Sequence, residues 1–84
     1  MDELLKKITL LSYPIWNLRE VQEYFGVGKV VGRRMMDQAI LQANGAVVGM
    51  PTKIKSESMI ALFTGHSKGE ELKILKAGVT DGEE

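Results

Sequence analysis

The sequence predicts one small domain that is mostly α-helical and carries a single β-hairpin. Its 84 residues are 44% hydrophobic and 26% charged, which is near the globular average and sufficient for one thin core. Two glycine-bearing breaks, at residues 26–28 and 44–45, separate segments with helical spacing of apolar residues. A β-branched stretch with a Gly/Pro turn follows the second break and predicts the hairpin.

The first element is a short amphipathic helix. Leu4, Leu5, Ile8 and Leu11 have the spacing of one helical face, and the helix ends before Pro14.

The next helix, over residues 18–25, has the clearest start signal in the chain. Asn17 can cap it, and Glu20, three residues later, can bond back to the cap nitrogen. Trp16 can pack on Val21 as a hydrophobic staple.

Another helix, over residues 29–43, follows the Gly26-Val27-Gly28 turn, and Asn44-Gly45 ends it. Gly32 is expected to permit close packing of this helix. Its inner side is predicted to carry Met35, Met36, Ala39, Ile40 and Ala43.

The hairpin is predicted over residues 46–55. Ser56 is expected to cap a further helix that runs to Phe63 and stops at Gly65. These elements form a domain over residues 1–66. Residues 67–84 are expected to be an acidic, partly flexible tail with one or two amphipathic turns and a fraying end.

The charges are unevenly distributed although the formal net charge is zero. Residues 29–55 carry five basic residues against the single acid Asp37, a net charge of +4, and the ends of the chain are neutral or acidic. This asymmetry is expected of a protein that presents one face to a polyanion. Charge alone leaves open an ordinary solvated helix face.

Catalytic, metal and cofactor sites are not predicted. The chain has one histidine, His66, and no cysteine, so neither a nucleophile with its base nor a metal cluster can be assembled. Gly26-Val27-Gly28-Lys29 lacks the spacing of a phosphate-binding loop. With no apolar run of membrane-spanning length and no signal-peptide pattern, we expect a soluble, cytoplasmic protein that is not an enzyme.

The order helix, short turn, helix, hairpin, helix predicts a winged helix-turn-helix. In that arrangement the helix over 29–43 presents its first turns to the major groove, and the hairpin, or wing, meets phosphate or the minor groove. Val31 could instead belong to the core. The predicted DNA-binding residues are Lys29, Val30, Val31, Arg33, Arg34, Lys53 and Lys55.

Residues 13–64 resemble the excisionase-like and MerR-like winged-helix domains of phages and mobile elements. The resemblance lies in the run from Tyr24 to Gly28, the Arg33-Arg34 pair, the basic hairpin end Lys53-Ile54-Lys55 and the closing Leu62-Phe63. It implies a small, sequence-specific, duplex-DNA-binding protein. Recombination directionality factor, transcriptional regulator and small terminase subunit are the implied roles, with self-association on DNA and a recombinase among the implied partners.

A rival hypothesis is a protein–protein adaptor on the same scaffold. In that case Trp16, Val30, Val31 and the amphipathic ends of the chain would dock a partner.

Overall fold

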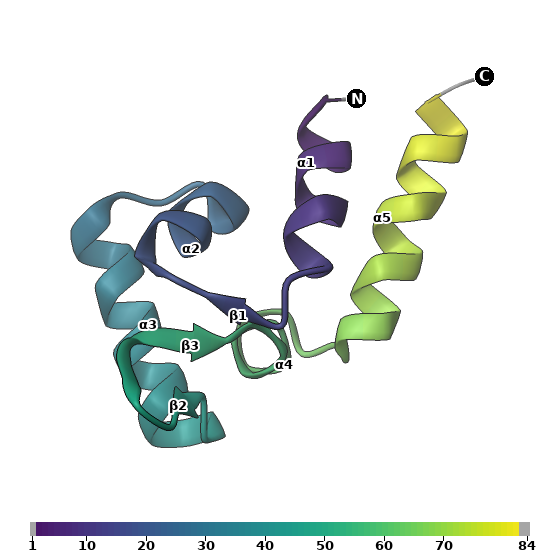
Figure 1. Ribbon diagram of the computed structural model, residues 1–84. Helices are drawn as coiled ribbons and strands as arrows, with labels where there is room; N and C mark the ends of the chain where they lie inside the picture. Colours follow the sequence, from purple (N-terminus) through teal and green to yellow (C-terminus); the bar gives the residue numbers. More distant parts are fainter. Residues whose placement is uncertain (1, 83–84) are drawn as a thin grey trace.

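A computed structural model of the chain describes residues 2–82 and shows five helices around a small antiparallel sheet (Figure 1). The predicted class, mostly helical with a small β component, is confirmed. The elements in chain order are α1 (Asp2–Leu11), β1 (Ile15–Trp16), α2 (Leu18–Phe25), α3 (Lys29–Ala43), β2 (Ala46–Val47), β3 (Met50–Lys55), α4 (Ser56–Thr64) and α5 (Lys68–Gly82).

The start of α2 is built as predicted. The Asn17 side chain accepts a hydrogen bond from the Glu20 amide at 3.1 Å, and the Asn17 amide donates to Glu20 Oε1 at 2.9 Å. Trp16 and Val21 on either side of this capping box are both fully buried in the core. The Trp16 indole donates to the Leu10 carbonyl at 2.8 Å, so the same side chain also holds the end of α1.

Burial of Trp16 corrects one part of the adaptor hypothesis. A side chain with no exposed surface cannot serve as an anchor for a partner, since a docking residue must be accessible before the complex forms. The ring instead packs against Tyr24 and Phe25, with centroids 5.1 and 6.4 Å away.

The sheet contains one strand that the sequence analysis did not predict. β1 pairs with β3 in the order β1-β3-β2, with Ile15 opposite Lys55 and Trp16 opposite Ile54. This strand places Trp16 and Ile54 together in the centre of the core, where both are fully buried.

Ser56 does not cap α4, contrary to the prediction. Lys55 occupies the cap position without a side-chain bond. Ser56 is itself fully buried, and its Oγ donates to the Tyr13 carbonyl at 2.6 Å. The buried hydroxyl is therefore satisfied by a backbone carbonyl and does not bond to the helix end.

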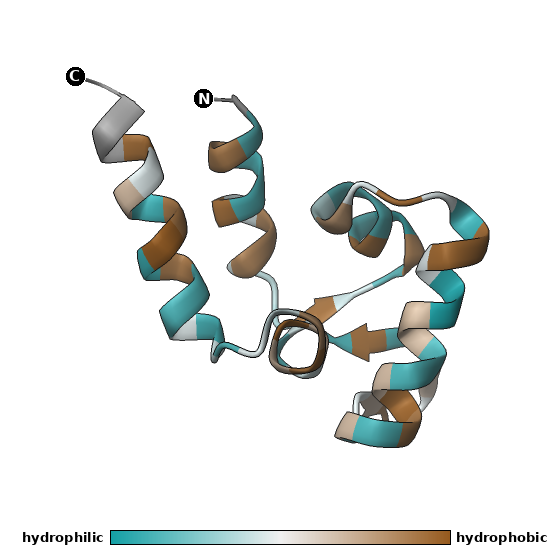
Figure 2. Ribbon diagram, turned by 180° about the vertical axis from the view of Figure 1, so that it is seen from behind, coloured by the Kyte–Doolittle hydropathy of each residue, from teal (hydrophilic) through white to brown (hydrophobic). Residues whose placement is uncertain are grey.

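The C-terminal segment is longer and better packed than the sequence analysis predicted. α5 spans Lys68–Gly82 and lies antiparallel beside α1 in both ribbon views (Figures 1 and 2). Leu75 belongs to the buried core, and Leu72 packs on it. Figure 2 shows apolar positions on the side of α1 that faces α5. The expected fraying end includes Glu83 and Glu84, which lie outside the described residues.

Hydrogen bonds of Glu71 and Lys68 attach α5 to the rest of the fold. The Tyr24 hydroxyl on α2 donates to Glu71 at 2.6 Å. Burial, together with this bond, raises the pKa of Tyr24 well above its usual range. Lys68 donates to Ser56 Oγ at 2.7 Å and to the Tyr13 carbonyl at 3.0 Å. Partial burial of the Lys68 side chain lowers the pKa of its ammonium group.

Candidate nucleic-acid interface

The turn between α2 and α3 sets the position of the predicted recognition surface. Gly26 ends α2 in the left-handed region at φ 65°, a conformation that glycine adopts without strain. Gly28 then occupies the cap position of α3 and offers no side chain to its first amides. The N-terminal amides of α3 are therefore left for solvent or for a ligand.

Gly32 brings the first half of α3 close to α2, as predicted. A Cβ at Gly32 would lie 3.1 Å from Leu18 Cδ1 and 3.3 Å from Gln22 Cγ, which is tighter than ordinary van der Waals contact. Only glycine permits this approach without displacement of its neighbours. Gly32, Met36 and Ala39 form the buried side of α3. The opposite side of the helix therefore faces solvent.

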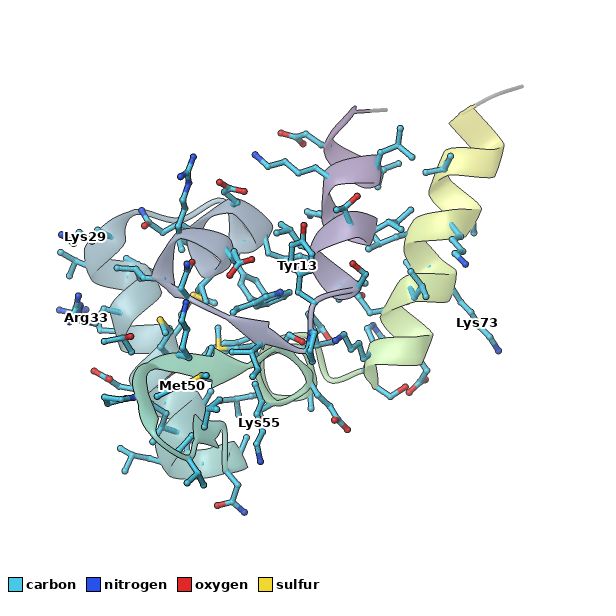
Figure 3. All side chains as sticks on the ribbon, viewed as in Figure 1. Tyr13, Lys29, Arg33, Met50, Lys55 and Lys73 are labelled. Carbon is cyan, nitrogen blue, oxygen red and sulfur yellow. The ribbon has the colours of Figure 1, made fainter. Side chains whose placement is uncertain are left out.

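All five predicted residues of α3 lie on the exposed surface. Val30 and Val31 are 68% and 47% exposed, so the core alternative for Val31 is wrong. Lys29, Arg33 and Arg34 are exposed as well. Figure 3 shows Lys29 and Arg33 on the same edge of the molecule, with their side chains directed away from the core.

The cations of this surface are not neutralised within the fold. In the part of the chain that the structure describes, residues 2–82, the ion pairs join Glu23 to Lys6 and to Arg19. None involves a predicted DNA-binding residue. Asp37, four residues after Arg33, is the one acidic residue of α3, and it is also exposed. The first half of α3 thus retains its positive charge for an external anion.

The hairpin contributes unevenly to this surface. Pro51 and Thr52, at the start of β3, share a hollow with Arg33 and Asp37 of α3, so the hairpin adjoins the side of the helix that carries Arg33. Lys53 follows directly and is partly exposed.

Lys55 lies apart from the α3 cations. It lines a different hollow together with Ile15, Glu57 and Lys68, and Figure 3 shows it well away from Lys29 and Arg33. The structure therefore brings Arg33 of α3 beside the start of β3, and it places Lys55 apart from that hollow.

Within residues 2–82, the contact between buried Ser56 and partly exposed Lys68 resembles catalytic machinery, and sequence spacing gave no signal for it. Ser56 Oγ lies 2.7 Å from Lys68 Nζ, a distance suited to a serine nucleophile with a lysine base. Ser56 has no exposed surface, however, and its hydroxyl also contacts the Tyr13 and Pro14 carbonyls. A substrate has no access to this oxygen, and the pair holds α4, α5 and the segment before β1 together.

Clusters of metal-ligating side chains and membrane-spanning helices are both absent from residues 2–82. No group of three or more metal-ligating side chains comes together within them. No helix in the described part of the chain has both the length and the apolar character needed to cross a membrane.

Comparison of the chain with models of protein families, with curated proteins and with solved structures found no match.

Proposed function

We propose that this chain is a winged helix-turn-helix protein that binds duplex DNA through α3. The observation that carries the proposal is the un-neutralised cationic surface on the first half of α3, with two exposed valines among its cations. A solvated helix face accounts for the charges, but it does not account for adjacent apolar residues with large exposed fractions.

The arrangement of the elements supports this proposal. α2 and α3 are joined by a short glycine turn, and β2 and β3 form a hairpin directly after α3. β1 attaches the hairpin to the rest of the fold, since it pairs with the other edge of β3. This layout is compatible with a winged helix, in which the second helix of the pair enters the major groove.

Each exposed group has a role in such a complex. The uncapped amides at the start of α3, together with Lys29, suit a phosphate. Arg33 and Arg34 suit phosphate or the paired acceptors of guanine, and Val30 and Val31 suit the methyl group of thymine. Lys53 would contact the backbone beside the groove that α3 occupies, with Lys55 as a peripheral phosphate contact.

The biological roles that we propose are those of a cytoplasmic recombination directionality factor or transcriptional regulator, with small terminase subunit as an alternative. One such module covers a short site, so self-association on DNA or cooperation with a recombinase would extend it.

A protein–protein adaptor is the second candidate function. The exposed fractions of Val30 and Val31 favour it, because apolar residues on a surface also dock protein partners. Val30 and Val31 would be among its anchors, whereas Trp16 would not, since it is buried.

The salt dependence of binding to mixed-sequence duplex separates these two functions. We expect affinity to fall steeply as salt rises, because phosphate contacts release counterions. Arg33→Ala and Arg34→Ala should each weaken binding by about 1–3 kcal/mol with an unchanged melting temperature. Lys73→Ala is the control, since Lys73 is exposed on α5, far from Arg33 (Figure 3).

Full duplex affinity in both arginine variants would show that α3 is not the recognition helix. Absence of salt-dependent binding in the wild-type protein would favour the adaptor.

A further inference from the structure

The tip of the β2–β3 hairpin is apolar and uncovered. Val47 pairs with Met50, which leaves Val48 and Gly49 as the two central residues of the turn. Gly49 has φ 78°, the conformation that the second central position of a type II turn requires. Val48 is 100% exposed and Met50 is 46% exposed, and Pro51 is exposed beside them.

This composition is unusual for a hairpin turn. Polar residues and glycine normally fill such positions, because an exposed apolar tip promotes aggregation and gains nothing from folding. No described part of the chain packs over Val48, since its side chain has its full surface exposed. The apolar tip is therefore available to an external partner.

The surroundings of the tip favour DNA as that partner. Pro51 shares a hollow with Arg33 of α3, and Lys53 lies on the same strand two residues further along. Neither cation is engaged in an ion pair within residues 2–82, and Asp37 is the one acid that lines this hollow. An apolar projection flanked by free cations is complementary to a minor groove, whose two edges are rows of phosphates.

On the basis of the proposed function, we propose that Val48, Met50 and Pro51 form a wedge that enters the minor groove and unstacks one base step. Met and Pro are among the residues that minor-groove proteins insert between bases, and the insertion kinks the duplex. Flexible pyrimidine–purine steps deform most easily and are the expected site of entry. The protein would then bend its DNA as well as bind it.

The test compares two short duplexes labelled with a fluorophore at each end. One is intact with a central TA step, and the other carries a single mismatch at that position, which makes unstacking easier. We expect the wild-type protein to bind the mismatched duplex about tenfold more tightly and to raise energy transfer between the ends of both.

Val48→Ser/Met50→Ser should bind the intact duplex with the same salt dependence but lose the preference for the mismatch and the rise in energy transfer. Leu5→Ser/Ile74→Ser is the matched control, because Leu5 and Ile74 are 50% and 52% exposed on α1 and α5. It should keep both properties. Thermal melts establish that each variant is folded.

A mismatch preference that persists in the hairpin variant would overturn the wedge and leave the proposed function intact. A folded hairpin variant that binds neither duplex would also overturn it, since the tip would then supply general affinity. Failure of the wild-type protein to bind either duplex at low salt would instead refute the proposed function itself.

Discussion

Trp16 is the residue at which the stability of this domain can be tested most sharply. Its ring is fully buried beside Tyr24, and its indole N–H donates to the Leu10 carbonyl across 2.8 Å. Two separate effects, burial of a large ring and one hydrogen bond to a buried carbonyl, thus depend on one side chain.

The expected magnitudes follow from those two effects. Trp16→Ala should reduce the free energy of unfolding by about 3–5 kcal/mol, the usual effect of deleting a buried aromatic ring. Trp16→Phe keeps most of the aromatic surface but removes one of the two donors to the Leu10 carbonyl, which still accepts from the Tyr13 amide at 3.1 Å. It should therefore reduce stability by about 0.5–1.5 kcal/mol, the usual net value of one hydrogen bond. A domain of this length has a total stability of about 4–13 kcal/mol, so the alanine variant is expected to be at or near the limit of folding.

Urea unfolding followed by circular dichroism measures both changes, with Tyr13→Ala as a control. Tyr13 is 42% exposed, and its substitution should change stability by less than about 1 kcal/mol. Tryptophan emission of the wild-type protein should be blue-shifted and should move to the red on unfolding. Red emission from the folded protein, with an unchanged transition in Trp16→Ala, would refute the burial and return Trp16 to the list of docking residues.

Three further outcomes are expected. Lys53→Glu should weaken duplex binding more than Lys55→Glu in a fluorescence anisotropy titration, because Lys55 lies apart from the α3 cations; equal losses would contradict the placement. Asn17→Ala should reduce stability by about 0.5–2 kcal/mol, and excess duplex should restore much of the melting temperature by mass action; no recovery at saturating duplex would count against binding to the folded state. Tyr24→Phe should reduce stability by about 1.5–3 kcal/mol through loss of the bond to Glu71, as measured by urea unfolding; an unchanged transition would show that α5 is held by its apolar contacts alone.

The helices around the turn could be predicted from sequence because their signals are local. The capping box at Asn17 and Glu20 marks the start of α2, and Gly26 and Asn44 end α2 and α3 in the left-handed conformation. Each of these features involves residues within one or two helical turns, so spacing along the chain is sufficient to detect it.

β1 and the role of Ser56 were not predicted because both depend on contacts that are distant in sequence. β1 has two residues, and its partner lies 38 to 40 positions further along the chain. The Ser56 hydroxyl meets the Tyr13 carbonyl across a separation of 43 residues. No periodicity within either segment reports such a pairing.

α5 differs, because the sequence does contain a local signal for the start of this helix. Ser67 Oγ accepts from the Glu70 amide at 3.1 Å, and the Ser67 amide donates to Glu70 Oε1 at 3.1 Å. This is a second capping box, with the Ser-x-x-Glu spacing that marks a helix start. The same bonds hold the pKa of Glu70 below its usual range. The apolar positions after it were too few to predict a full helix without α1 to pack against.

The candidate site could be predicted in composition but not in shape. Sequence spacing identified the basic residues of α3 and the hairpin, yet it could not show that Lys55 lies on a different side from Arg33. It also could not place Val31, because the exposure of that residue depends on which side of α3 packs against the rest of the fold.

Stability and the proposed recognition use separate sets of residues in this fold. The core side of α3 is formed by Gly32, Met36 and Ala39, which are buried, whereas Arg33 and Arg34 are exposed and un-neutralised within the described chain. Neutralising the arginines removes like charges from one helix face and leaves the core packing in place, so the fold should be at least as stable without them. Any affinity lost in those variants is then a property of the charged surface and not of the fold.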